Sequence, residues 1–195
     1  MQGGNMKNLA VLTGAIALAG ALGACSSSSS SSTSSSSSTA TASAAPMSGT
    51  ETAYGKGSAA TVSSLVFHLT FKGPVDTTGT TPLGATPAKG VSYTATTAAG
   101  NLVVTANSAG TTKGGVKSTK ACLATYTSTV PFTVDGAKST GKFAGATGSG
   151  KSVVVFSGVL PKASNGTCNE SQSAVPSAKK AVGTFTSTGT LTLKQ

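Results

Sequence analysis

The clearest pattern along the chain is an alternation of apolar and polar residues over residues 62–72. Leu65, Phe67, Leu69 and Phe71 occupy every second position, and polar residues stand between most of them. Successive side chains of a strand point to opposite faces, so this period of two predicts a strand with one buried face. Runs rich in β-branched residues predict further strands at 90–97, 102–107, 121–134, 152–160 and 182–193.

Turn-forming residues separate these runs. Glycine supplies the backbone freedom that tight turns need, and it stands in turn-like pairs between the runs, such as Gly73-Pro74, Asp135-Gly136 and Asn165-Gly166. Pro131 falls inside the run 121–134, where it predicts a bulge or an edge, because proline cannot donate to a sheet ladder. No helical stripe is evident after residue 58. The pattern therefore predicts an all-β domain of antiparallel strands, either a β-barrel or a β-sandwich.

The first 24 residues have the layout of a secretory leader. Lys7 gives a basic start, an uncharged and mostly apolar run follows over 9–21, and Leu22-Gly23-Ala24-Cys25 ends the segment. The apolar run is short for a membrane span. The last four residues resemble the bacterial lipobox, and this resemblance implies that the Cys25 thiol receives diacylglycerol and becomes the new N-terminus. Translation starts at either Met1 or Met6.

A serine-rich stretch follows Cys25. Residues 26–38 are twelve serines and Thr33, and small polar residues continue to about residue 58. This composition cannot form a core, so residues 25–58 are predicted to be a lipidated stalk and residues 59–195 a single domain. A flexible chain of this length spans about 30 Å. We expect the domain to stand outside the cytoplasm, anchored by lipid to the cell membrane or an outer membrane.

Charge narrows the choice of partners. The formal net charge is +10, and every basic residue apart from the single histidine is lysine. Arginine provides the planar fork that grips phosphates and guanine edges, so its absence argues against specific nucleic-acid binding. Attraction to anionic envelope polymers remains open, as does the simpler view that the lysines keep a threonine-rich sheet soluble.

Two cysteines remain in an exported chain once Cys25 is lipidated. Cys122 and Cys168 are predicted to form a disulfide, because such a compartment is oxidising. The competing interpretation, two free thiols or a metal site, needs more ligands than one histidine and a few acids supply. We therefore predict no metal and no cofactor.

Several residues resemble parts of catalytic or nucleotide sites. Residues 145–152 match the phosphate-loop pattern, but the β-branched run 153–156 follows where a helix would be needed, so we predict no nucleotide site. His68 stands on the polar face of the first strand, where a general base would need an orienting partner such as Asp76. Asp76, Asp135 and Glu170 lie in apparent turns, and Glu51 lies in the predicted stalk. No catalytic residue is assigned.

The segment 139–148 resembles the glycine-rich T-G-x-F-x-G-A-x-G segment of the allene oxide cyclase and dirigent-like β-barrels. The resemblance implies an eight-stranded antiparallel barrel. Gly141, Gly145 and Gly148 would permit a bend, Phe143 would enter the core, and residues 153–156 would form the next strand. No active-site residue of that superfamily can be placed on this chain.

Three functions follow as hypotheses. The first is a noncatalytic, lipid-anchored envelope protein whose domain binds an apolar small molecule, an envelope polymer or another surface protein. The second is a cyclase or isomerase acting on a small apolar substrate in a barrel cavity. The third is a cationic module that binds anionic polymers, with affinity that falls as salt rises.

Overall fold

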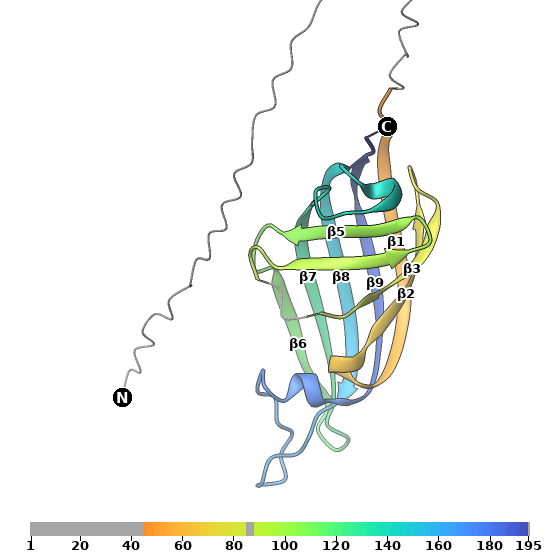
Figure 1. Cartoon of the computed structure of the whole chain (residues 1–195). Coiled ribbons are helices and arrows are strands. Elements are labelled where there is room, and N and C mark those ends of the chain that lie inside the picture. Colours follow the sequence, from red (N-terminus) through yellow and green to blue (C-terminus); the bar gives the residue numbers. More distant parts are fainter. Residues whose placement is uncertain (1–44, 85–87, 195) are drawn as a thin grey trace, which may run out of the picture. The chain divides into compact units, whose positions relative to one another are not determined.

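The computed structural model describes residues 45–84 and 88–194. They form nine β-strands and three short 3₁₀ turns (Figure 1). The strands are β1 (Ser48–Thr61), β2 (Val66–Lys72), β3 (Thr77–Pro82), β4 (Ser92–Thr97), β5 (Gly100–Ala106), β6 (Thr111–Ser118), β7 (Leu123–Val134), β8 (Thr147–Val159) and β9 (Lys179–Thr192). The 3₁₀ turns are η1 (Val62–Ser64), η2 (Gly141–Phe143) and η3 (Val175–Ser177).

All strand pairs are antiparallel, and the sheet closes on itself. The strands follow the order β5-β4-β3-β2-β1-β9-β8-β7-β6, and an additional pairing joins β5 to β7. Eight strands thus form a closed barrel, with β6 extending the sheet beside β7. The prediction of an antiparallel β-barrel is confirmed, and the sandwich alternative is set aside.

Pro131 marks the place where β7 changes partner. Its register with Lys151 of β8 is continuous, so no bulge interrupts that side. Its carbonyl accepts a hydrogen bond from the Asn107 N–H at 2.9 Å, and in an antiparallel strand the N–H and C=O of one residue point the same way. The missing N–H of Pro131 therefore faces the junction where β5 ends and β6 begins.

The core follows the alternation that predicts β2. Leu65, Phe67, Leu69 and Phe71 are each at most 3% exposed. The strand is shorter than expected, because residues 62–64 turn as η1 before it begins. On the opposite face, His68 and Lys72 are exposed, as the period of two predicts.

The stalk prediction is wrong at its C-terminal boundary. Strand β1 begins at Ser48 and pairs along its length with β9, so the domain starts inside the segment assigned to the stalk. The strand lacks large apolar residues because β2 approaches it closely. A Cβ atom on Gly55 would lie 2.1 Å from the His68 carbonyl oxygen, and one on Gly57 would lie 2.2 Å from that of Val66. Small residues are therefore required on the inner face of β1, and without large apolar residues the strand shows no hydrophobic alternation.

The link between β7 and β8 also differs from expectation. Asp135-Gly136 does not form a two-residue hairpin but opens a connection that runs to Ala146 and contains η2. The Lys138 and Ser139 N–H groups donate to the Asp135 carbonyl at 3.2 and 3.0 Å. Phe143 of this connection is fully buried, and Gly141 and Gly145 adopt positive φ angles of 61° and 69°.

The two ends of the barrel carry different connections. The Ser48 end carries the start of β1, the end of β9 and the β7–β8 connection (Figure 1, near the label C). The disulfide end carries the β6–β7 turn and the long β8–β9 connection over residues 160–178 (Figure 1, lower end).

Candidate functional site

A shallow, open groove lies on the outer wall of the barrel, toward the disulfide end. It has a volume of about 610 Å³ and draws side chains from four neighbouring strands. We call it the outer groove; its lining residues are Lys56, Gly57 and Ser58 of β1, His68 of β2, Val155 and Ser157 of β8, and Val182, Gly183 and Thr184 of β9.

Strand register brings these residues together. Lys56 pairs with His68 on one side and with Thr184 on the other, and Thr184 pairs in turn with Val155. Side chains at paired positions stand on the same face of a sheet, and strands lie about 4.8 Å apart. Residues more than a hundred positions apart in sequence therefore line one surface.

The lining combines a cationic side with an apolar side. Lys56 and His68 are the ionisable lining residues, and no carboxylate is among the lining. Val182 is 52% exposed, which is high for a large apolar residue, and Val155 of β8 lies diagonally across from it, opposite Thr184. Together with three hydroxyl side chains, this surface suits an anionic ligand better than a cationic one.

His68 is not joined to the acid that a catalytic arrangement would need. Asp76 lies in the β2–β3 turn at the Ser48 end, where it accepts hydrogen bonds from the Gly73 N–H and from Lys72 Nζ, each at 3.2 Å. The Gly73 hydrogen bond, followed by that of Lys72, holds the pKa of Asp76 below its usual range. Asp76 thus shapes a turn, and His68 faces the outer groove.

Asp135 has a similar turn-forming role. Its carboxylate lies 2.7 Å from Lys138 Nζ and also accepts from the Lys138 N–H at 3.2 Å. The hydrogen bond from the Lys138 side chain contributes most to lowering the pKa of Asp135. Both surface aspartates therefore have a lysine partner at the Ser48 end.

Glu51 is the unexpected ionisable group of the structure. It is buried on the inner face of β1, and its Oε2 accepts a hydrogen bond from the Val75 N–H at 3.0 Å. Its Oε1 is buried and has no hydrogen-bond partner among the described residues. Burial raises the pKa of Glu51, and the hydrogen bond from Val75 only partly opposes this. The interpretation of Glu51 as a stalk residue is wrong, because the small residues around it conceal a strand.

We expect Glu51→Gln to stabilise the protein at neutral pH. A raised pKa in the folded state favours the protonated carboxyl, so this contribution to stability is present at acidic pH and is lost as pH rises through the folded pKa. The amide of Gln remains neutral and still accepts from the Val75 N–H. The free energy of unfolding, measured by urea titration between pH 4 and pH 8, should favour the variant increasingly as pH rises.

Two further variants control this experiment. Glu51→Ala leaves the buried Val75 N–H without its partner and should cost about 1–3 kcal/mol at every pH. Glu170→Gln makes the same charge change at an exposed position. A wild-type protein that matches Glu51→Gln in stability at both pH 4 and pH 8 would contradict the raised pKa of Glu51.

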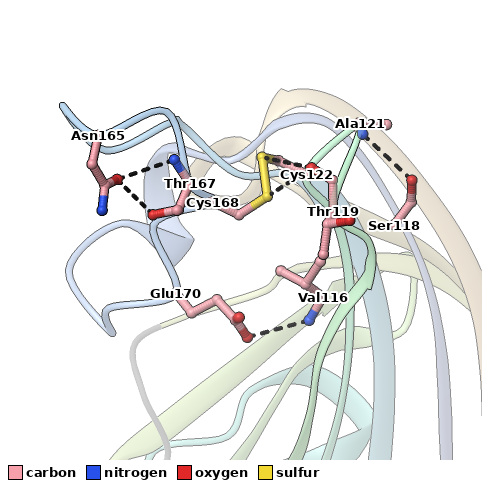
Figure 2. Close-up of a disulfide and its surroundings, with 9 residues drawn as sticks. All are labelled: Val116, Ser118, Thr119, Ala121, Cys122, Asn165, Thr167, Cys168 and Glu170. Atoms are coloured by element: carbon pink, nitrogen blue, oxygen red, sulfur yellow. Dashed lines mark hydrogen bonds between the residues drawn. A yellow bond between two sulfur atoms is a disulfide. The ribbon is translucent and has the colours of Figure 1, made fainter.

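The disulfide end is organised around Cys122 and Cys168 (Figure 2). Their sulfur atoms are bonded, with Cα atoms 5.2 Å apart, which confirms the predicted pairing. The bridge ties the β8–β9 connection to the start of β7. Glu170 of that connection accepts a hydrogen bond from the Val116 N–H of β6 at 3.3 Å, and burial together with the Glu170 charge raises the pKa of Tyr126 on β7.

The phosphate-loop match does not precede a helix in the structure. Lys151 and Ser152, which end the phosphate-loop match, lie within β8, and strand rather than helix continues after them. Cys25 and the leader lie outside the described residues. Among residues 45–84 and 88–194, no three His, Cys, Asp or Glu side chains cluster as metal ligands. The described part of the chain also has no helix long and apolar enough to span a bilayer.

Comparison of the chain with protein-family models, with curated proteins and with solved structures gives no match.

Proposed function

We propose that this protein is an exported envelope lipoprotein, anchored through Cys25, whose barrel is a noncatalytic binding module. The observation that carries the proposal is the disulfide between Cys122 and Cys168. Disulfides form and persist in oxidising compartments outside the cytoplasm, which is where the leader over residues 1–24 would deliver the chain.

The cysteine arithmetic supports the anchor. The chain has three cysteines, and the barrel joins two of them. Cys25 is left as the thiol that can form a thioether with diacylglycerol, in the step that the lipobox resemblance implies. Two or more acyl chains anchor a protein stably, whereas one chain gives only reversible membrane binding.

The outer groove supports a binding role for the barrel. Its side chains are presented by four strands of a closed sheet, so their positions depend on the scaffold rather than on a loop. Its lysine, histidine and valine side chains face outward, where a partner in the envelope can reach them.

Replacing Cys25 by serine should release the protein from membranes. Serine has no thiol, so the thioether to diacylglycerol cannot form. We expect the wild-type protein in the membrane fraction, and Cys25→Ser either in the soluble fraction or retained as an unprocessed precursor. Intact mass of the wild type should fit a chain that begins at an acylated Cys25.

Ser30→Ala is the matched control, because it changes one hydroxyl close to the anchor and should stay in the membrane fraction. A wild-type mass that includes Met6 to Ala24 and no fatty acid would refute the proposed anchor.

A further inference from the structure

We propose that the disulfide end of the barrel binds a linear polyanion of the cell envelope through its lysines. The inference rests on the proposed function for its compartment, and it names the chemistry of the partner. Its basis is the separation of lysines from acids along the barrel, together with the end at which the chain enters it.

Most acidic residues of the domain lie away from the disulfide end, and they form ion pairs or are buried. Asp76 and Asp135 pair with Lys72 and Lys138 at the Ser48 end. Glu51 is buried inside the barrel.

Glu170 is the acid that the disulfide end retains among the described residues, and its carboxylate accepts from the Val116 N–H at 3.3 Å. The lysines at this end therefore meet little negative charge from the protein itself.

Five lysines gather at the disulfide end. All five are exposed, and no salt bridge is formed by any of them within the described residues. They are Lys117 of β6, Lys120 of the β6–β7 turn, Lys162 of the β8–β9 connection, and Lys179 and Lys180 at the start of β9.

Register and the disulfide place these lysines on one rim. Ser118 pairs with Leu123, Leu123 with Val159, and Val159 with Lys179, so the rim crosses four adjacent strands. Lys162 forms a β-bridge with Cys168, which the disulfide fixes to β7. At about 4.8 Å per strand, the rim is roughly 15 Å wide.

Such spacing suits a polymer with repeating charges. Lysine ammonium groups act as point charges without the geometric demand of arginine, so several of them spread over a rim attract a chain of anions rather than one shaped ligand. Lys56 continues the positive charge from the rim into the outer groove.

The chain enters the barrel at the end opposite this surface. The predicted anchor precedes Ser48, and β1 runs its 14 residues from the Ser48 end to the disulfide end. At about 3.3 Å per residue, the strand is roughly 45 Å long. The lysine rim thus lies at the end of the barrel opposite the start of β1.

The test compares two sets of four charge-removing substitutions in the full mature protein, held in nonionic detergent. One variant carries Lys→Gln at 117, 120, 162 and 179, and the control carries Lys→Gln at 89, 142, 151 and 194, which lie elsewhere on the barrel. Both lose the same net charge. The probe is long-chain inorganic polyphosphate at low ionic strength, with thermal melts to verify that both variants fold.

We expect the rim variant to lose at least tenfold in affinity for polyphosphate and the control to lose less than threefold. Wild-type affinity should fall steeply as salt rises from 50 to 300 mM. Equal losses in the two variants, or binding insensitive to salt, would overturn the inference. Binding to phosphatidylglycerol vesicles without binding to polyphosphate would overturn it too, in favour of a membrane surface.

The outcome is independent of the Cys25 experiment. A chain that binds polyphosphate through the rim but carries no lipid would refute the proposed anchor and leave the rim as a polyanion site. An acylated chain that does not bind polyphosphate would support the proposed anchor and refute the polyanion site.

Discussion

Loss of the disulfide should lower the free energy of unfolding by about 4 kcal/mol in the chain-entropy treatment of a loop of this length. The two cysteines are 46 residues apart, and the loop between them includes all of β7 and all of β8. In the Cys122→Ser/Cys168→Ser variant the unfolded chain regains the freedom that the bridge removes. Urea denaturation of the oxidised wild type and of the variant measures the difference.

The same change should free the β8–β9 connection locally. Cys168 links that connection to the body of the barrel, and Lys162 is an exposed trypsin target within it. We expect trypsin to cut the variant after Lys162 well before it cuts the oxidised wild type. Reduction of the wild type should reproduce both effects, and a reduced protein that retains its urea midpoint and its trypsin resistance would contradict the stabilising role of the bridge.

Phe143→Ala should cost about 3–5 kcal/mol, the range typical of a fully buried phenylalanine. Phe143 is 0% exposed and belongs to the main core, although it lies in a connection rather than a strand. Backbone hydrogen bonds hold that connection in place, from the Lys142 N–H to the Ala99 carbonyl at 2.9 Å and from the Gly145 N–H to the Gly136 carbonyl at 2.8 Å. The connection cannot easily collapse into the space that the ring leaves, so we expect the full cost of a cavity.

Lys142→Ala is the matched control, because it truncates the adjacent and exposed side chain and should change stability by less than about 0.5 kcal/mol. Urea titration of both variants separates loss of the ring from disturbance of the backbone. Equal stabilities would mean that Phe143 does not anchor the Ser48 end of the barrel.

Some features of the barrel follow from local sequence. The inner face of β2 can be predicted because alternation depends only on neighbouring residues, and Leu65 to Phe71 show it strongly. The disulfide follows because one pairing remains once Cys25 is assigned to lipid. Frequent glycine turns between short β-branched runs indicate an antiparallel all-β domain, which the structure confirms.

Other features depend on contacts between distant segments. Strand β1 shows no hydrophobic alternation, because the backbone of β2 lies so close to Gly55 and Gly57 that only glycine fits there. This constraint becomes evident only in the folded sheet. Local sequence does not predict strands β3 and β6 either, since their threonines and glycines show no apolar alternation.

The sequence by itself therefore determined the fold class, the buried face of β2 and the partner of each domain cysteine, because these depend on local periodicity and on a count. Only the tertiary structure decided the burial of Glu51, the closure of β5 on β7, the outer groove and the lysine rim. Each of these depends on which residues long-range register places side by side, and a single chain's local pattern does not encode that register.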